Sequence, residues 1–440
     1  MSTPEPGASG PGAAEPGALE PVPNWIRSHL RRRACPLGGV LVATLLGMAF
    51  TLAWDPVLHH VSSWDIPGDI WSTFRAAHWV GWGDLGGVYN ADTQLVTLPG
   101  IAVLLAPVAM LSGHFNLTES LTPVILTHPT SWLLLGPAVL LYGYACLVPL
   151  DATADELGTD RRRRMVLVAL EAVVLFQVLA IWGHPEDVLA LGLALYAILA
   201  TCRDRWSLSA WLWGAALVVQ PLVVVMFAVS FHRVPRGQRV RTCLFAAIPT
   251  VVLTAPALLS NWSGTSAVFL HQKNFPHLDH ATPWMVVAPK LAGDAVGAGP
   301  GRLLAVVAAV VLGGAAFRWR PTLAGVVWLC ALVLSLRCAF ESVMVPFYLG
   351  PPLAVIVLAA AATNRWWRLF GAFAVAMAAT VLSFRHTSEW AYWLPMTVLL
   401  GLGLAAAWPG AVAVRSDARS AAPGWPAPAP DPAAVAVRAD

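Results

Sequence analysis

Residues 187–231 read DVLALGLALYAILATCRDRWSLSAWLWGAALVVQPLVVVMFAVSF, and this stretch decides the fold class. An apolar run over 187–202 ends at Arg203, and a longer apolar run follows over 206–231. About 20 consecutive apolar residues cross the hydrocarbon core of a bilayer as a helix. Long apolar runs separated by short arginine-bearing breaks therefore predict transmembrane helices joined by tight loops.

The same pattern continues along the chain. Apolar runs bounded by charged residues occupy 37–54, 131–150, 165–182, 187–202, 206–231, 242–259, 303–317, 321–336, 343–363, 369–384 and 391–408. Only 12% of the 440 residues are charged and 57% are hydrophobic, whereas soluble domains carry roughly 25% charge. We predict an all-α, polytopic transmembrane bundle over 31–414, with about 10–13 membrane segments and disordered cytoplasmic tails at 1–30 and 415–440.

Arginine clusters set the expected orientation, because short loops rich in Lys and Arg stay in the cytoplasm. The clusters lie at 31–33, 161–164, 203–205, 233–241, 318–320 and 365–368. With all of them inside, the external segments are 55–125, 183–187, 260–302, 337–342 and 385–389. The net charge of +3 is spread through these loops, so no nucleic-acid-binding patch is predicted.

Two stretches need a separate interpretation. Residues 96–111 contain two prolines and are predicted to be interfacial or re-entrant, which leaves 55–125 as one long external region. In 206–231 the pair Gln220-Pro221 stands near the middle, and proline interrupts a helix. This pattern favours two half-helices that return to the cytoplasm, with one tilted helix as the alternative.

The external segments mix carboxylates, imidazoles, cations and tryptophans, whereas the cytoplasmic loops contain mostly arginine. Such a mixture suits a lipid that carries phosphate and sugar, because it supplies a base, cations for phosphate and aromatic faces for sugar. The alternative is that these are ordinary loop residues, since any polytopic protein places polar residues in loops.

The sequence WDIPGDIWSTFRAAH at 64–78 follows the first membrane helix, and GDLGGVY at 83–89 and Leu98-Pro99 come next. This order resembles the start of family 87 of the GT-C glycosyltransferases, polyprenyl-phosphate-mannose-dependent enzymes of actinobacterial envelopes. The resemblance covers about 37–400 by segment order. Gly183-His184-Pro185-Glu186-Asp187 stands where the family has Gly-Gln-x-Asn, and Gln220-Pro221 stands near its Lys-x-x-Pro position.

The resemblance implies a GT-C-like glycosyltransferase, most simply a mannosyltransferase, at the outer face of a bacterial plasma membrane. It would transfer a sugar, with inversion, from a polyprenyl-phosphate donor to an envelope glycolipid or polysaccharide. The matching position for the general base is Asp69, with Asp65 as its competitor. No cofactor is implied.

Ten other residues are candidates for binding the phosphate or sugar of the donor. They are Arg75, His78, His184, Glu186, Asp187, Lys273, His277, His280, Arg337 and Glu341. Structural alternatives remain open: Asp69 and Asp187 as helix caps, and Arg337 with Glu341 as a mutual salt bridge. The histidine and acid spacings match no strong metal signature, so no metal site is predicted.

Glu171 lies inside an apolar run, where an intramembrane carboxylate costs about 2.5–3.5 kcal/mol. We expect it to pair with the nearby Arg164.

Two other functions also remain open for the whole chain: a membrane transporter or lipid flippase, and a noncatalytic envelope protein of the same fold. A transporter should show polar residues along a path through several helices and often shows inverted repeats, and neither is clear in this sequence.

Overall fold

The computed structural model describes residues 31–58, 68–90, 95–114, 129–270, 272–276, 280–385 and 387–410, together with Ser28 and Thr93. The chain divides into two units, residues 1–34 with 418–440 and residues 35–417, and the account below concerns the second. Apart from Ser28, both predicted tails lie outside the described residues.

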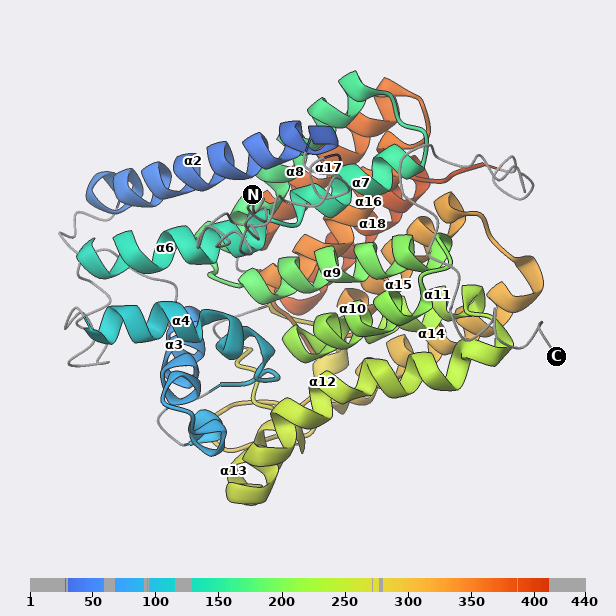
Figure 1. Cartoon of the computed structure of the whole chain (residues 1–440). Coiled ribbons are helices and arrows are strands. Elements are labelled where there is room, and N and C mark those ends of the chain that lie inside the picture. Colours follow the sequence, from blue (N-terminus) through green and yellow to red (C-terminus); the bar gives the residue numbers. More distant parts are fainter. Residues whose placement is uncertain are drawn as a thin grey trace, which may run out of the picture. The chain divides into compact units, whose positions relative to one another are not determined.

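The second unit is a bundle of helices (Figure 1). They are α2 (Ala34–Leu58), α3 (Gly68–Gly81), α4 (Gly100–His114), α6 (Pro129–Tyr144), α7 (Leu147–Glu156), α8 (Arg161–Phe176), α9 (Pro185–Cys202), α10 (Trp206–Val219), α11 (Val224–Ser230), α12 (Arg239–Ser260), α13 (Trp262–Leu270), α14 (Pro300–Trp319), α15 (Leu323–Ala339), α16 (Gly350–Ala361), α17 (Trp366–Ser383) and α18 (Glu389–Ala406). Each predicted apolar run falls on one or two of these helices, so the predicted helical bundle is confirmed.

Shorter elements join the helices. They are η1 (Leu85–Tyr89), η2 (Gln177–Ile181), η3 (Pro221–Val223), η4 (Phe231–Arg233), η5 (Arg236–Gln238), η6 (Pro283–Val287) and η7 (Pro346–Leu349). Strand β1 (His280–Ala281) pairs antiparallel with β2 (Val343–Met344). This two-stranded ladder ties the segment before α14 to the turn between α15 and α16.

Six helical spans in the described residues are long and apolar enough to cross a membrane. They are Leu135–Glu156, Arg161–Ile181, Pro185–Cys202, Arg236–Ser260, Pro300–Trp319 and Trp366–Ser383. Shorter apolar helices are Ala34–Phe50, Gly100–Leu111, Trp206–Val219, Pro221–Arg233, Leu323–Ala339 and Pro346–Ala361. These lengths and compositions indicate a membrane protein, and the number of 10–13 crossings stays a prediction.

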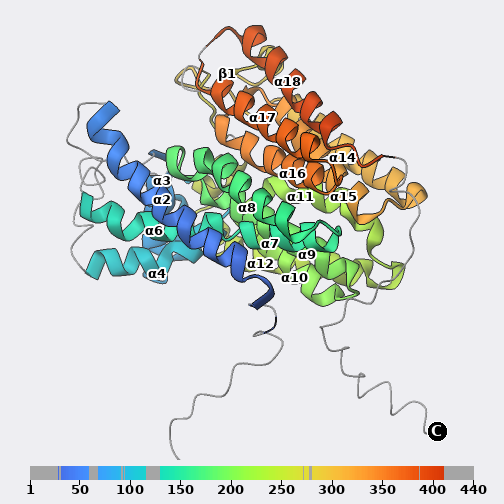
Figure 2. The same ribbon diagram turned by 90° about the horizontal axis from the view of Figure 1, so that it is seen from above.

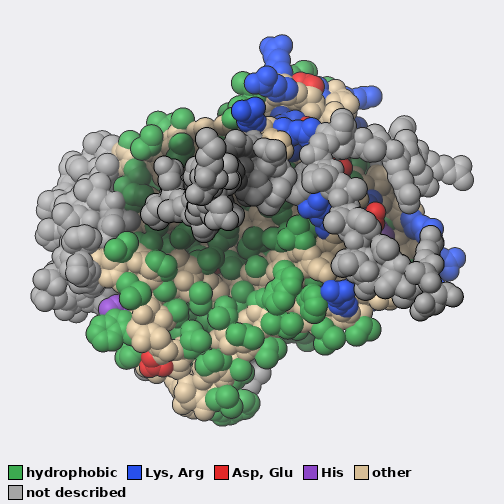
Figure 3. Space-filling model, in the orientation of Figure 1, with side chains coloured by type: hydrophobic (Ala, Val, Ile, Leu, Met, Phe, Trp, Pro, Cys, Tyr) green, Lys and Arg blue, Asp and Glu red, His purple; other side chains and the backbone are tan. Residues whose placement is uncertain are grey.

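The helices divide into a buried centre and an apolar outer layer. Every residue of α16 is buried, and α16 packs against α8, α15 and α17 (Figure 2). A helix that is apolar on all sides belongs inside a bundle. By contrast, α12 and α14 expose large apolar side chains such as Val251 and Val310, each 60% exposed. Hydrophobic side chains cover the face on which α12 lies (Figure 3).

The arginine-bearing helix ends meet at one end of the unit, which we call the arginine end. Arg163 at the start of α8 donates from Nη1 to Asn364 Oδ1 (2.6 Å), between α16 and α17. Arg203, which follows α9, pairs with Glu156 at the end of α7. Arg239 at the start of α12 lies over the ring of Phe317, near the end of α14, at 4.4 Å. Together with the contact of Arg233 with Cys202, these contacts place the clusters at 161–164, 203–205, 233–241, 318–320 and 365–368 at one end of the unit.

The predicted break at Gln220-Pro221 is confirmed. Helix α10 ends at Val219, Gln220 is extended (φ −148°, ψ 106°), and Pro221 opens η3 before α11. Arg233, at the end of η4, then donates from Nη1 to Cys202 Sγ (3.2 Å), at the end of α9. The chain thus returns to the level at which it entered α10, as expected for a pair of half-helices.

The predicted pairing of Glu171 with Arg164 is wrong. Arg164 donates from Nε to Asp151 Oδ1 (2.8 Å) and also pairs with Asp155, both on α7. Glu171 is fully buried, and neither of its carboxylate oxygens has a hydrogen-bond partner within the described residues. Seven residues of helix separate Glu171 from Arg164 by about 10 Å, whereas α7 presents two carboxylates beside the guanidinium group.

Candidate functional site

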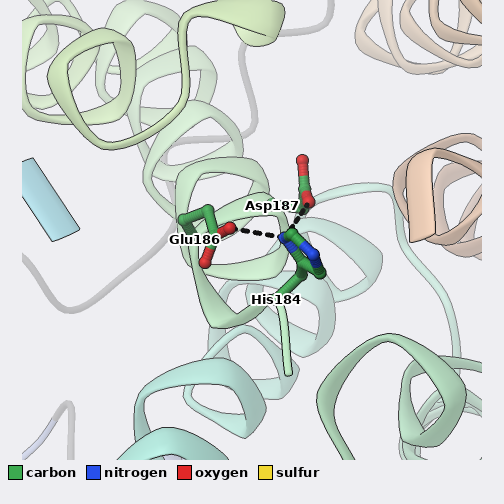
Figure 4. A group of neighbouring side chains, drawn as sticks. All are labelled: His184, Glu186 and Asp187. Carbon is green, nitrogen blue, oxygen red and sulfur yellow. Dashed lines mark hydrogen bonds and ion pairs between the residues drawn. The ribbon is translucent and has the colours of Figure 1, made fainter. Parts of the chain in front are cut away.

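The first turn of α9 brings three predicted site residues together, namely His184, Glu186 and Asp187 (Figure 4). Gly183 makes the turn before the helix with a positive φ of 68°, a conformation that glycine adopts without strain. Pro185 is the first helical residue, where its missing N–H removes no hydrogen bond. His184 Nδ1 lies 2.6 Å from Glu186 Oε1 and 3.8 Å from Asp187 Oδ2.

Two neighbours fix the orientation of these side chains. The imidazole of His184 stacks on the ring of Phe347 in η7, with ring centroids 3.4 Å apart. Gln220, at the break after α10, donates from Nε2 to Asp187 Oδ1 (2.8 Å). The other oxygens, Glu186 Oε2 and Asp187 Oδ2, have no hydrogen-bond partner within the described chain, although both side chains are buried.

A second group of charges is built from α14 and α15. Arg302 donates to both oxygens of Glu341, from Nε (2.7 Å) and from Nη2 (3.1 Å). Arg337 pairs with the same carboxylate across one turn, so the predicted Arg337–Glu341 salt bridge is confirmed. Arg302 also donates from Nη1 to Gln272 Oε1 (2.9 Å), before β1. One fully buried carboxylate thus holds two guanidinium groups.

The guanidinium group of Arg337 keeps unused donors. Arg337 is 3% exposed, and its Nε and Nη2 have no hydrogen-bond partner among the residues that the structure describes. It lies over the ring of Tyr348 at 4.9 Å, and its charge acts on Asp187. We define the polar cluster as His184, Glu186, Asp187, Gln220, Arg302, Arg337 and Glu341. Buried donors and acceptors without partners are rare in proteins and call for a specific explanation.

The polar cluster lies opposite the arginine end. Helix α9 runs from the polar cluster at His184 to Cys202, beside Arg203. Helix α14 runs from Arg302 in the polar cluster to Arg318 near its other end. The same two helices therefore carry arginines at one end and the polar cluster at the other.

Part of the predicted first external segment also lies away from the arginine end. Asn261, just after α12, donates from Nδ2 to the carbonyl oxygen of Tyr89 (3.2 Å) at the end of η1. Helix α12 begins at Arg239 in the arginine end, so this contact is at its far end. The Tyr89 hydroxyl donates to the carbonyl oxygen of Thr97 (2.9 Å), and burial raises the pKa of Tyr89. The turn that follows α3 is thereby fixed against α12.

The remaining predicted site residues lie outside the polar cluster or outside the description. Asp65 and His277 are not among the described residues, and only the backbone of Asp69 is described, in the first turn of α3. Arg75 and His78 are half-buried on α3, with the His78 ring 5.5 Å from that of Trp82, and Lys273 is exposed. Their assigned roles stay predictions.

His280 holds elements together at a different place. It is buried in β1, its Nε2 lies 2.6 Å from the carbonyl oxygen of Ser383, and its ring stacks on Tyr392 with centroids 3.8 Å apart. Ser383 ends α17, and its hydroxyl accepts from Gln177 Nε2 (2.6 Å). These contacts join β1 to α17 and α18, and a role for His280 in binding the donor stays a prediction.

The sequence interpretation missed Arg302 and Gln220 as members of the site. Arg302 is an arginine at the predicted external end of its helix, against the usual charge bias, and that departure is a signal that could have found it. Gln220 was noted only as part of the Gln220-Pro221 pair, for the helix break and for the Lys-x-x-Pro position of the resembling family. Its contact with Asp187 depends on how the α10 break packs against α9, so no sequence pattern could reveal it.

Comparisons with known proteins give no relative that assigns a function. A scan against models of protein families found no matching family, and a search of curated proteins found no match. The functional conclusion therefore rests on the geometry of the polar cluster and on the motifs of the predicted first external segment.

Proposed function

We propose that this protein is a membrane glycosyltransferase that moves a sugar, mannose in the first instance, from a polyprenyl-phosphate donor to an envelope glycolipid or polysaccharide. The observation that carries the proposal is Arg337, a buried guanidinium group with two donor nitrogens that have no partner among the described residues and with a charge that acts on Asp187. Guanidinium groups bind phosphate oxygens with two parallel hydrogen bonds.

The distribution of arginines supports the assignment of the polar cluster to the outer side of the membrane. The arginine end corresponds to the cytoplasmic side, because Lys- and Arg-rich short loops are retained there. The polar cluster is then at the outer face of a bacterial plasma membrane. A lipid donor reaches such a site from the outer leaflet, with its phosphate near Arg337 and Arg302.

The proposed reaction is a single displacement. The acceptor hydroxyl oxygen bonds to the anomeric carbon of the sugar, and the bond from that carbon to the phosphate oxygen breaks. The phosphate leaves with the electron pair, while the carboxylate of Asp69, or of its competitor Asp65, takes the hydroxyl proton. Arg337 and Arg302 neutralise the departing phosphate, because fixed charges stabilise developing charge without reorganisation.

The test is transfer of radiolabelled mannose from a polyprenyl-phosphate donor into lipid by membranes that express the protein. Wild type should transfer, Asp69→Asn should lose transfer at an equal protein level, and Asp65→Asn should retain it. Arg337→Gln should weaken transfer strongly, whereas Arg203→Gln at the arginine end should not. If the wild-type protein transfers none of several sugars to any of several acceptors, the proposal is rejected.

A lipid flippase or transporter is the second candidate, and one observation favours it. The α10–α11 break places Gln220 against buried Asp187 inside the bundle, and broken helices line the substrate sites of many transporters. Purified protein in liposomes discriminates the two functions. Movement of a labelled polyprenyl-phosphate sugar between leaflets, without transfer to an acceptor, would support the flippase. If neither activity is found, the noncatalytic envelope protein remains.

A further inference from the structure

His184, Glu186 and Asp187 each offer a ligand atom to one point in space. Their ligand atoms all lie within 4.8 Å of one another, and Glu186 and Asp187 both reach toward the imidazole (Figure 4). Nitrogen and oxygen ligands sit about 2.0–2.2 Å from a zinc ion, so two ligands of one ion lie at most about 4.4 Å apart. Small side-chain rotations bring all three atoms within that range.

The unpaired oxygens are a second observation that points to a cation. Glu186 is 4% exposed and Asp187 is 2% exposed, yet Glu186 Oε2 and Asp187 Oδ2 have no hydrogen-bond partner in the described part of the chain. His184 Nδ1 lies within hydrogen-bonding distance of Glu186 Oε1. Two adjacent buried carboxylates repel each other, and a cation between them removes the repulsion.

The surroundings also match those of protein metal sites. Residues around the ligands usually orient them through hydrogen bonds and packing. Gln220 Nε2 holds Asp187 Oδ1 and leaves Oδ2 directed to the centre, and the ring of Phe347 fixes the plane of the imidazole. The ligand geometry is therefore set by three separate parts of the chain, namely the start of α9, the α10 break and η7.

We propose that His184, Glu186 and Asp187 bind a divalent transition-metal ion of the Zn²⁺ or Mn²⁺ type. One imidazole and two carboxylates are suitable ligands for such ions. This site goes beyond the proposed transferase, because the ion binds the protein without donor or acceptor.

Charge balance explains how a metal ion and a lipid phosphate would fit together. Arg302 and Arg337 exceed Glu341 by one positive charge, whereas Glu186 and Asp187 add two negative charges. With neutral His184 the polar cluster carries one net negative charge, and a divalent ion makes it positive by one. A phosphodiester, with one negative charge, then makes the buried site neutral. This joint binding, unlike the metal site, rests on the proposed function.

Titration of the purified full-length protein in detergent with Mn²⁺ alone, followed by electron paramagnetic resonance, tests the metal site. We expect about one Mn²⁺ bound per chain, displaced by Zn²⁺. His184→Gln and Asp187→Asn should abolish binding, and Gln220→Leu should weaken it about tenfold. Asp155→Asn at the arginine end is the matched control and should bind as wild type does.

Two outcomes would overturn the metal site. One is a monodisperse wild type that binds neither Mn²⁺ nor Zn²⁺ at millimolar concentration, which would leave the contact between His184 and Glu186 as a hydrogen bond alone. The other is binding that survives His184→Gln and Asp187→Asn in folded protein. Asp187→Glu, which keeps a carboxylate, should retain weaker binding and serves if Asp187→Asn does not fold. Metal binding without sugar transfer would reject the transferase alone, and transfer without metal binding would reject the site alone.

Discussion

Arg164 and Arg337 occupy opposite ends of the bundle and have opposite hydrogen-bonding states. Arg164 is held by two carboxylates of α7, Asp151 and Asp155, and its side chain is 14% exposed. Arg337 shares the single carboxylate of Glu341 with Arg302 and is 3% exposed, and its Nε and Nη2 have no partner within the described part of the chain. Arg164 thus forms structural ion pairs at one end of the bundle, whereas Arg337 has the chemistry of a binding site at the other.

The difference has a physical origin. A buried donor without a partner costs about 1–3 kcal/mol, and more when it is charged. At the arginine end Arg164 meets this requirement with two neighbouring acids, although Nε of Arg163, Arg233 and Arg368 has no partner within the described residues. In the polar cluster two nitrogens of Arg337 and one oxygen each of Glu186 and Asp187 lack such partners. Buried charged groups without hydrogen-bond partners are expected where a bound ligand supplies those partners.

The largest expected difference between the two ends comes from removing one arginine at each. Arg337→Met leaves buried charges of the polar cluster uncompensated and should lower the free energy of unfolding by about 3–5 kcal/mol. Arg203→Met removes a partly exposed pair with Glu156 and should lower it by about 0–1 kcal/mol. Denaturant unfolding of both variants in detergent measures this, and equal losses would contradict the comparison.

Two glycines of α14 extend the comparison to packing. A Cβ at Gly301 would lie 2.1 Å from the Phe340 carbonyl oxygen, next to the Arg302–Glu341 contact. Gly301→Ala should therefore destabilise the protein by about 1–3 kcal/mol. Gly314 lies nearer the arginine end, and a Cβ there would have no atom of the described residues within 4 Å. Gly314→Ala should therefore stabilise the protein by about 0.5–1 kcal/mol. Thermal unfolding that ranks the two variants the other way would reject this packing.

Glu171, inside α8, is the third position to change. Its buried carboxylate has no hydrogen-bond partner within the described residues, so Glu171→Met should stabilise the protein by about 1 kcal/mol or more. Asp151→Leu, which removes the partner of Arg164, should instead destabilise it. Denaturant unfolding measures whether the free energy of unfolding rises or falls in each of the two variants. A strong loss of stability in Glu171→Met would indicate that this carboxylate has a partner.

The smallest expected effect is at the cap of α8 in the arginine end. Asp160 accepts from the Arg163 backbone N–H (3.0 Å), and loss of such a cap costs about 1 kcal/mol. Asp160→Ala should lower the thermal midpoint slightly, whereas Asp160→Asn, which retains an N-cap acceptor, should not. Sugar transfer and Mn²⁺ binding should be unchanged in both variants, because the polar cluster is at the other end.

Much of the helical framework could be predicted from local sequence. Each apolar run became helix, and the break at Gln220-Pro221 followed from the missing proline N–H. The Arg337–Glu341 pair could also be predicted, because the two opposite charges lie only four residues apart, at the end of α15. The Arg164–Glu171 pairing was not, because acids of another helix were closer to the guanidinium group.

The sequence by itself determined that this chain is a bundle of apolar helices with arginine clusters at one end, because hydrophobic period and charge bias act locally along the chain. Only the tertiary structure decided that Gln220 contacts Asp187 and that Arg302 and Arg337 share Glu341. These contacts join helices distant in sequence, and the packing of the helices, which no local pattern encodes, sets which side chains meet and which atoms remain unpaired.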